Sequence, residues 1–275
     1  MITFPNAKIN IGLDILKKRP DGYHDISTVM MPVPWTDVLE IVPGNHESDT
    51  LTVTGRKVDC PPQKNLVMKA VKSLRGIADF PPVDMFLHKV IPDGAGLGGG
   101  SADAAFALTA VNNLFNLGLG KDELASVASA IGADCPFFIY NRPMACTGTG
   151  TRMHEFDLSL PAGLTLVIVK PPVSVPTKDA YKAVSPAIPN ENLEQLLSSL
   201  PVEKWQGCVK NDFEPSVFPS YPVIAEVKRR LLAEGAVYAS MSGSGSSVYG
   251  FFAADIMTEC VAAMFPCCDI MVQKL

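Results

Sequence analysis

Residues 91–105 read IPDGAGLGGGSADAA, and five of the seven positions from Gly94 to Gly100 are glycine. Glycine adopts positive φ angles that other residues avoid, and it lets another group approach the main chain closely. The stretch follows a strand-like run at 83–90 and precedes a helical run at 101–116. A loop in this place presents free backbone N–H groups and the positive end of a helix dipole, which together favour an anion.

Several phosphate-binding patterns can be tested against this loop. A Walker A motif needs a lysine that is absent here, and the protein-kinase motifs V-A-I-K and H-R-D do not occur. Gly94, Gly96 and Gly99 satisfy G-x-G-x-x-G, but Asp122, near the place expected for the acidic residue, begins a helical stretch. A glycine-rich linker would explain neither the strand before nor the helix after. Ser101 is a candidate to cap the helix, to hold a metal-bound phosphate, or both.

The composition of the chain is that of an ordinary globular protein. Its 275 residues are 47% hydrophobic and 19% charged, which predicts one or two domains with full cores. Asp and Glu outnumber Lys and Arg by 28 to 23, so the formal charge is −5. Proteins that grip nucleic acid usually carry a basic excess. We therefore expect no nucleic-acid partner.

The chain shows no pattern of a membrane or exported protein. Its densest apolar stretch, residues 164–169, is far shorter than the roughly 18 residues that cross a bilayer. The start MITFPNAKINIGL has neither a basic segment followed by an apolar block nor the Arg- and Ser-rich look of a transit peptide. We expect a cytoplasmic protein with no membrane partner.

Cysteine and histidine spacings do not indicate a metal site. The seven cysteines include no C-x-x-C pair, and the four histidines show no H-E-x-x-H or H-x₃-H spacing. Structural zinc sites depend on such pairs. We therefore expect no zinc site, and cysteines that are reduced and mostly buried.

Residues 7–15, AKINIGLDI, alternate between apolar and polar side chains as a half-buried strand does. The odd positions would face the core, while Lys8, Asn10, Gly12 and Asp14 share the other face. Such a polar row is either solvent surface or the wall of a cleft. Other runs predict strands at 27–33, 38–42 and 51–54 and helices at 65–78 and 122–131.

The pattern changes after residue 150 or so. There follow a buried strand at 164–170, several helical segments, strands at 236–241 and 246–252, a helix at 254–264 and a strand at 270–274. This order is typical of a split β-α-β, ferredoxin-like unit. We expect two α+β lobes, residues 1–155 and residues 156–275, of which the first carries the glycine-rich loop.

The loop pattern P-x-G-A-G-L-G-G-G-S-x-D-A-A resembles the central phosphate motif of the GHMP small-molecule kinases. Three further segments narrow the resemblance: PNAKINIGLDILKKRPDGYH at 5–24, GADCPFF at 132–138 and MSGSGSSVYGFF at 241–252. Together they are similar to the 4-diphosphocytidyl-2-C-methyl-D-erythritol kinase family, ATP-dependent kinases of the non-mevalonate isoprenoid pathway. One departure is Ala102, where many relatives carry a second serine.

This resemblance implies the two-lobed GHMP kinase fold, an α+β fold with an N-terminal ribosomal-protein-S5-like lobe and a C-terminal ferredoxin-like lobe. It implies ATP as co-substrate, Mg²⁺ held by ATP, Ser101 and water, and a small-molecule cytidine diphosphate substrate whose 2-hydroxyl is phosphorylated. The residues expected to bind ATP are Lys89, Pro92, Asp93, Gly94, Ala95, Gly96, Leu97, Gly98, Gly99, Gly100, Ser101 and Ala102.

Phosphoryl transfer to an alcohol needs positioning, charge neutralisation and a group that accepts the hydroxyl proton. The resemblance assigns the last role to Asp134 and places Lys8 beside it, where a cation keeps the carboxylate ionised and steadies the transferred group. Asn10 shares the strand face of Lys8 and is placed to hydrogen-bond the acceptor's hydroxyls. Without the resemblance, Asp134 is equally a turn-capping residue, and Lys8 and Lys89 are surface lysines.

The acceptor residues that the resemblance implies are Asn10, Tyr23, His24, Thr177, Tyr181, Gly243, Ser244 and Gly245. Tyr23 would stack on the cytosine ring, and His24 would read its hydrogen-bonding edge. By their places in VPTKDAY, Tyr181 resembles a second stacking aromatic and Thr177 a diphosphate contact. The turn at 243–245 is either a simple hairpin turn or part of the acceptor or ATP site.

Other functions stay open at this point. A GHMP kinase for another small alcohol, such as homoserine or mevalonate, would share the loop but not the RPDGYH segment. A nucleotide-binding regulator that has lost catalysis is disfavoured by the presence of both Lys8 and Asp134. A nicotinamide oxidoreductase rests on the bare G-x-G-x-x-G match alone.

Overall fold

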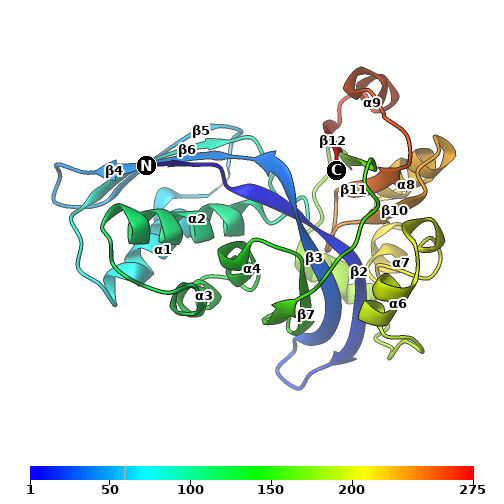
Figure 1. Cartoon of the computed structure of the whole chain (residues 1–275), viewed down its shortest axis with the longest axis horizontal. Helices are drawn as coiled ribbons and strands as arrows, with labels where there is room; N and C mark the ends of the chain where they lie inside the picture. Colours follow the sequence, from blue (N-terminus) through cyan, green and yellow to red (C-terminus); the bar gives the residue numbers. More distant parts are fainter. Residues whose placement is uncertain (59) are drawn as a thin grey trace. The chain divides into compact units, whose positions relative to one another are not determined.

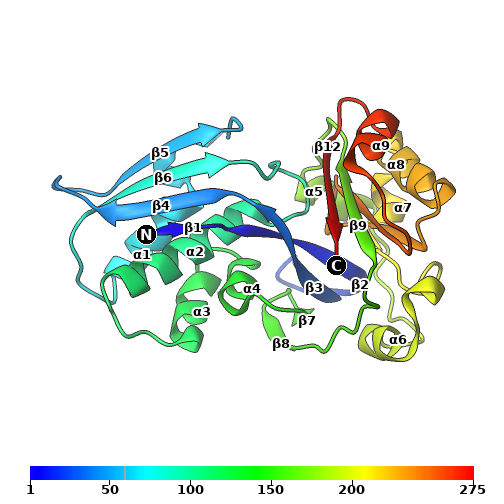
Figure 2. The same ribbon diagram turned by 45° about the horizontal axis from the view of Figure 1, so that its top comes forward.

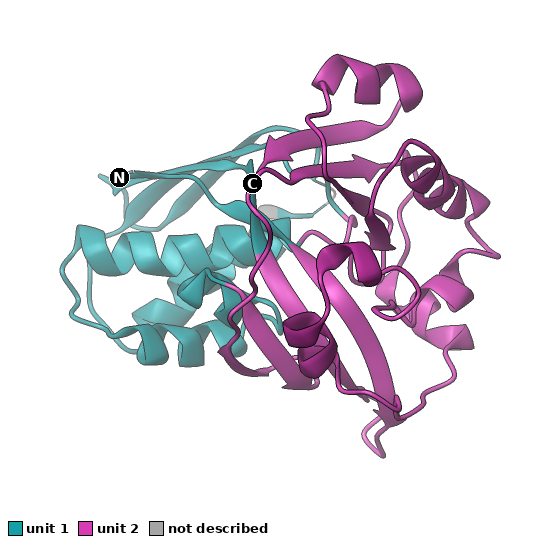
Figure 3. Cartoon of the chain, turned by 45° about the vertical axis from the view of Figure 1, so that its right-hand side comes forward, with its two compact units in different colours: residues 1–8, 32–93, 98–142 teal, residues 9–31, 94–97, 143–275 magenta. Residues whose placement is uncertain are grey.

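The computed structural model describes residues 1–58 and 60–275, which form the elements labelled in Figure 1 and, from a second side, in Figure 2. Figure 3 shows two compact units in different colours. Unit 1 holds residues 1–8, 32–93 and 98–142, and unit 2 holds residues 9–31, 94–97 and 143–275. Each unit combines segments that are separated in the sequence. The predicted lobes 1–155 and 156–275 are instead continuous segments, and they stay a prediction.

Unit 1 is built on a sheet of four strands in the order β1-β4-β6-β5. Strand β6 pairs antiparallel with β4 and parallel with β5. The strands are β1 (Ile2–Thr3), β4 (Val38–Pro43), β5 (Thr50–Gly55) and β6 (Val83–Lys89), and the helices are η1 (Pro62–Lys64), α1 (Leu66–Arg75), α2 (Gly99–Leu114), α3 (Lys121–Ser129) and α4 (Cys135–Tyr140). The strands and longer helices predicted for this region are confirmed, whereas β1 and α4 were not predicted.

Helix α2 is the central helix of unit 1. Alanines cover most of its circumference, and its buried residues include Ala102, Ala104, Ala105, Ala107 and Ala110. Because alanine lacks a long side chain, neighbouring helices approach the axis closely, and both α1 and α4 pack against α2. The start of α2, where the glycine-rich loop ends, is thereby held on several sides.

Unit 2 contains a second sheet in the order β10-β11-β9-β12, antiparallel throughout. Its strands are β9 (Thr165–Lys170), β10 (Tyr238–Met241), β11 (Val248–Phe252) and β12 (Asp269–Lys274), and the helices are α5 (Thr177–Ala180), η2 (Tyr181–Ala183), α6 (Leu193–Ser199), η3 (Val202–Lys204), α7 (Glu214–Val217), α8 (Pro222–Ala233) and α9 (Thr258–Met264). Every residue of β9 is buried, as a central strand requires. This strand order, with α8 and α9 in the two crossovers, confirms the ferredoxin-like prediction.

The third sheet has the order β2-β3-β7-β8, with strands β2 (Asn6–Lys18), β3 (His24–Thr36), β7 (Met144–Gly148) and β8 (Arg152–Glu155). The alternation predicted a core face and a polar face for β2, but residues 7–13 are all buried. In unit 2, Leu13 exchanges backbone hydrogen bonds with Lys210 and Asp212 (2.8 and 2.9 Å). On the polar face, a Cβ atom on Gly12 would lie 2.4 Å from Leu193 Cδ1 and 3.1 Å from Val209 Cγ1. Distant chain therefore packs on both the edge and this part of the polar face of β2, which local periodicity does not report.

The cysteines are less buried than expected. Only Cys135 and Cys146 are buried, while Cys208, Cys260 and Cys267 are exposed. Among the described residues, no three His, Cys, Asp or Glu side chains gather as a metal site would require. No helix in residues 1–58 and 60–275 has the length and apolar character that a membrane span needs.

Candidate active site

The glycine-rich loop joins β6 to α2, as predicted. Gly94, Gly96 and Gly98 have φ angles of 59°, 73° and 72°, in the left-handed region that favours glycine. The residues between them, Ala95 and Leu97, are buried at 2% and 1% exposure. The alternation therefore lets the backbone turn at every second residue while the intervening side chains anchor it.

The middle of this loop packs against the turn that joins β10 to β11, and both segments belong to unit 2. The backbone N–H of Ser247 donates to the carbonyl of Ala95 (3.1 Å), and the Ser242 hydroxyl donates to the carbonyl of Gly96 (2.9 Å). A Cβ atom on Gly96 would lie 2.0 Å from the Ser242 carbonyl oxygen. The turn at 242–247 is thus a hairpin connection that also holds the loop.

The end of the loop forms the start of α2 in unit 1. Gly98 is the N-cap residue, and the first intrahelical bond runs from Ala102 N–H to the Gly98 carbonyl (2.9 Å). Ser101 therefore lies in the first turn and is not the N-cap, which corrects one of the roles considered for it. The N-cap residue Gly98 makes no side-chain cap bond to this first turn, and free N–H groups at a helix start favour an anion.

Lys8 and Asp134 come together in unit 1. Their Nζ and Oδ2 atoms are 3.6 Å apart, and the side chains are 4% and 34% exposed. Asp134 precedes α4 without forming a side-chain cap bond, so the turn-capping reading is wrong. A Cβ atom on Gly98 would meet Phe138 Cζ at 2.9 Å and Lys8 Cγ at 3.2 Å. The pair thus lies beside the end of the glycine-rich loop.

Ser101 also has a partner next to Asp134. Burial raises the pKa of the Cys135 thiol to about 11, against the opposing effect of a hydrogen bond with the Ser101 side chain. Cys135 is the residue that follows Asp134 in the chain. Side-chain contacts therefore link the first turn of α2 to the segment that carries the carboxylate.

Lys89 is a buried side chain with two acidic partners. Its Nζ donates to Asp103 Oδ2 at 2.7 Å and also to Asp37 Oδ2, and Lys89 itself is only 6% exposed. The surface-lysine reading is therefore wrong. Our sequence reasoning missed Asp37 and Asp103, although a carboxylate within an apolar stretch needs a partner when buried.

Asn10, like the other predicted acceptor residues, lies in unit 2, and both its side chain and its backbone form hydrogen bonds. Its Nδ2 donates to Thr28 Oγ1 (3.1 Å), and its backbone N–H donates to Ser242 Oγ (3.3 Å). The hydroxyl of Tyr249 donates to its carbonyl (2.9 Å). Thr28, Ser242 and Tyr249 fix this residue and were not identified from the sequence, because each comes from a different strand or turn.

Two aromatic residues of the predicted acceptor site contact each other directly. The ring of Tyr181 stacks on His24, with centroids 4.6 Å apart and planes at 15°, and Phe213 packs edge-on against Tyr181. Tyr23 is 67% exposed. The hydroxyls of Thr177 and Ser244 lie 3.3 Å apart, which brings the 243–245 turn to the α5 segment. Unit 2 therefore gathers most of the predicted acceptor residues.

Two domain families match the chain in sequence order. Residues 65–142 match the GHMP kinases N terminal domain, and residues 185–267 match the GHMP kinases C terminal domain. A 4-diphosphocytidyl-2-C-methyl-D-erythritol kinase of Parabacteroides distasonis is 52% identical over 252 residues, which is 92% of either chain. The chain belongs to the 4-diphosphocytidyl-2-C-methyl-D-erythritol kinase family of the GHMP kinases.

Other relatives of this GHMP kinase agree. A protein of the same name from Bacteroides fragilis is 50% identical over 254 residues, covering 92% of both chains. A crystal structure of 4-(cytidine 5'-diphospho)-2C-methyl-D-erythritol kinase has a TM-score of 0.80 and 31% identity, over 99% of this chain and 98% of that one. Homoserine kinase from Cytophaga hutchinsonii, with a TM-score of 0.71 and 20% identity over 98% and 94% of the two chains, shares the fold. The predicted α+β fold and the ATP-dependent small-molecule kinase class are confirmed.

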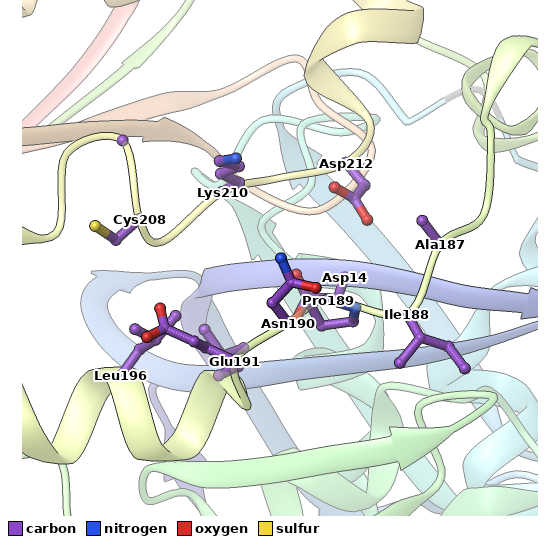
Figure 4. Close-up of a pocket in the computed structure, with 12 residues that line it drawn as sticks. Asp14, Ala187, Ile188, Pro189, Asn190, Glu191, Leu196, Cys208, Lys210 and Asp212 are labelled. Atoms are coloured by element: carbon purple, nitrogen blue, oxygen red, sulfur yellow. The ribbon is translucent and has the colours of Figure 1, made fainter.

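A cavity of about 620 Å³ in unit 2 of the kinase is lined by none of the predicted site residues. Figure 4 shows Asp14, Lys210 and Asp212 around it, facing the 187–191 segment. Burial, and then the Asp212 carboxylate, raise the pKa of Asp14 from 3.8 to about 6, while Lys210 opposes the shift. The side chain is therefore less acidic than an ordinary aspartate.

Replacing Asp14 with asparagine should stabilise the kinase above pH 6 or so. A carboxyl whose pKa is raised to about 6 in the folded state binds its proton more tightly than in the unfolded state. Wild-type stability therefore falls as the pH rises from about 4 to about 6, and the amide escapes this loss. Urea unfolding at about pH 4 and about pH 7.5 should show the advantage only at the higher pH.

The exposed residue Asp157 supplies the matched control for this measurement. Asp157→Asn should leave the free energy of unfolding close to that of wild type at both pH values, because substitutions at exposed positions change stability little. A stability gain of Asp14→Asn that is equal at both pH values would contradict the role of its protonation.

Proposed function

We propose that this kinase transfers the γ-phosphoryl group of ATP to the 2-hydroxyl of 4-diphosphocytidyl-2-C-methyl-D-erythritol, a step in non-mevalonate isoprenoid precursor biosynthesis. The observation that carries the proposal is the Lys8–Asp134 pair, 3.6 Å apart beside the loop that ends at Gly98. The names of relatives at 50–52% identity give the acceptor.

In this proposal the loop from Pro92 to Ala102 binds the ATP phosphates. The uncapped N–H groups at the start of α2 supply donors and the positive end of the helix dipole. Mg²⁺ would be held by the ATP oxygens, Ser101 and water, and it would neutralise phosphate charge. The place of Ser101 in the first turn of α2, beside the N–H groups proposed to bind the phosphates, fits this arrangement.

Asp134 would accept the proton of the acceptor hydroxyl as the oxygen attacks the terminal phosphorus. Its side chain is 34% exposed, so a substrate can reach it, whereas Lys8 is 4% exposed and held in place. The Lys8 ammonium lies 3.6 Å from the carboxylate and offers a positive charge to the transferred group. Proton acceptance and charge neutralisation are the two tasks that this reaction leaves to side chains.

The acceptor would be bound by residues of unit 2. Asn10 would hydrogen-bond its hydroxyls, and Thr177 with the turn Gly243, Ser244 and Gly245 would contact its diphosphate. His24 would read the cytosine edge, with its ring plane fixed by the stack on Tyr181. Tyr23, which is 67% exposed, would cover the base by stacking.

An acceptor panel tests the proposal directly. ADP release from ATP should be fast with the cytidine diphosphate acceptor and slow with homoserine or mevalonate, measured by a coupled assay at equal concentrations. Preference for homoserine or mevalonate would keep the kinase class and reject the acceptor. Absence of ADP release with all three would favour a nucleotide-binding regulator instead.

Replacing Tyr23 with alanine should raise the KM for the acceptor roughly tenfold, since stacking an aromatic ring on a base contributes about 1–3 kcal/mol. The KM for ATP should stay within about twofold of wild type, because uniform loss of acceptor binding leaves the other substrate unaffected. Phe86→Ala, at another exposed aromatic residue (46%), is the control. Equal increases in both KM values would reject the stacking role.

A further inference from the structure

Lys89, Asp37 and Asp103 form a buried ion cluster at the base of the glycine-rich loop in unit 1. We propose that this cluster is a positioning device that fixes both ends of the loop, so that the first turn of α2 presents its N–H groups to the nucleotide phosphates. The inference rests on the proposed function and deepens it. It assigns Lys89 to holding the loop in place of touching the nucleotide.

The beginning of the loop is held by Asp37. This residue lies between β3 and β4 and is fully buried. Its Oδ1 atom accepts hydrogen bonds from the backbone N–H groups of Val90 (2.6 Å) and Ile91 (2.8 Å), while its other oxygen accepts from Lys89. One carboxylate therefore binds three successive residues just before Pro92 and sets the direction in which the chain enters the loop.

The end of the loop is held through Lys89. Its ammonium donates to Oδ2 of Asp103, which lies in α2 two residues after Ser101 (2.7 Å). Gly99, the first residue of α2, passes directly over this contact, because a Cβ there would lie 3.4 Å from Lys89 Nζ and 3.0 Å from Ile91 Cγ2. The same lysine thus ties the strand before the loop to the helix after it.

The cluster is not what stability alone would select. Burying ions costs their hydration free energy, and replacing a buried ion pair by well-packed apolar side chains often leaves protein stability unchanged or raises it. Oδ1 of Asp103 is buried without a hydrogen-bond partner. A buried carboxylate at the start of α2 with one oxygen lacking a hydrogen-bond partner points to a requirement of function.

Two substitutions at one position separate positioning from folding. Asp103→Ala removes the tie between Lys89 and α2 and leaves Lys89 paired with Asp37, and alanine suits a helix. Asp103→Asn keeps an oxygen that accepts from Lys89. The full-length proteins would be titrated calorimetrically with AMP, ADP and a non-hydrolysable ATP analogue, and both KM values and the melting temperature would be measured.

We expect the melting temperature of Asp103→Ala to lie within a few degrees of wild type. Its affinity for the ATP analogue should be roughly tenfold lower, because one charge-assisted hydrogen bond that positions the loop is lost. The loss of affinity should be smaller for ADP and absent for AMP, because it increases with the number of phosphate groups that contact the loop. The KM for the acceptor should not change. Asp103→Asn should retain the wild-type affinities within about threefold, since the hydrogen bond survives.

Three results would overturn the positioning role. They are unchanged affinity for the ATP analogue in a folded Asp103→Ala protein, an equal loss for AMP, ADP and the analogue, and loss of the fold, which would show a purely structural cluster. Failure of the proposed function is a separate outcome, since wild type would then release no ADP with the cytidine diphosphate acceptor.

Discussion

Asp134→Asn is expected to lower kcat by about 10²-fold or more, because positioned general bases contribute roughly 10²–10⁴ to the rate. The amide keeps the shape of the carboxylate but cannot accept the hydroxyl proton of the acceptor. Nucleotide affinity should change little, since the loop that binds the phosphates is untouched. The measurement is steady-state ADP release together with direct titration of an ATP analogue.

Lys8→Ala should act in the same way, because the two side chains form one ion pair of 3.6 Å. A change confined to KM in this variant would make Lys8 a binding residue instead. Asp157→Asn, at an exposed position outside the proposed site, is the matched control and should retain wild-type kcat. Full turnover in Asp134→Asn would remove this carboxylate from the mechanism.

Gly96→Ala is expected to destabilise the protein by about 3 kcal/mol or more, because it combines overpacking with a left-handed backbone. The new Cβ would lie 2.0 Å from the carbonyl oxygen of Ser242, and the residue has a φ of 73°. Because backbone lies on both sides of this contact, the loop or the 242–247 turn must move. ATP affinity should therefore fall at least tenfold in the protein that still folds, in proportion to the lost phosphate contacts.

Gly118→Ala separates the two causes of this loss. Gly118 has a φ of 76°, close to that of Gly96, but nothing lies within 4 Å of a Cβ built on it. Chemical unfolding of this variant should show a free energy of unfolding only about 1 kcal/mol below wild type, which is the cost of the backbone strain alone. Equal stability of the two variants would mean that the close approach of Gly96 to Ser242 does not constrain the loop.

The sequence predicted the loop well because its signals are local. A strand, a run of glycines and an alanine-rich helix follow one another within 83–116, and each is specified by its own residues. The ferredoxin-like order after residue 164 was predictable for the same reason, since strand and helix patterns there are short and regular. These local patterns were sufficient for the fold class.

The errors arise where distant segments meet. The polar face of β2 was expected to be solvent surface or the wall of a cleft. The solvent alternative is wrong at Gly12, which lies against Leu193, a helix residue 181 positions later in the chain. The alternative that Lys89 is a surface lysine is wrong, because its partners Asp37 and Asp103 come from a strand junction and a helix. Charge pairing across elements has no period in a sequence and is visible only once the elements are packed.

Ser242 has a consequence for how acceptor selectivity can change. Its hydroxyl accepts from the backbone of Asn10 and donates to the carbonyl of Gly96, so one buried oxygen serves the acceptor strand and the phosphate loop together. If the proposed sites hold, laboratory evolution toward a new alcohol would meet a trade-off at this turn, because a change there also displaces the loop proposed to bind the ATP phosphates.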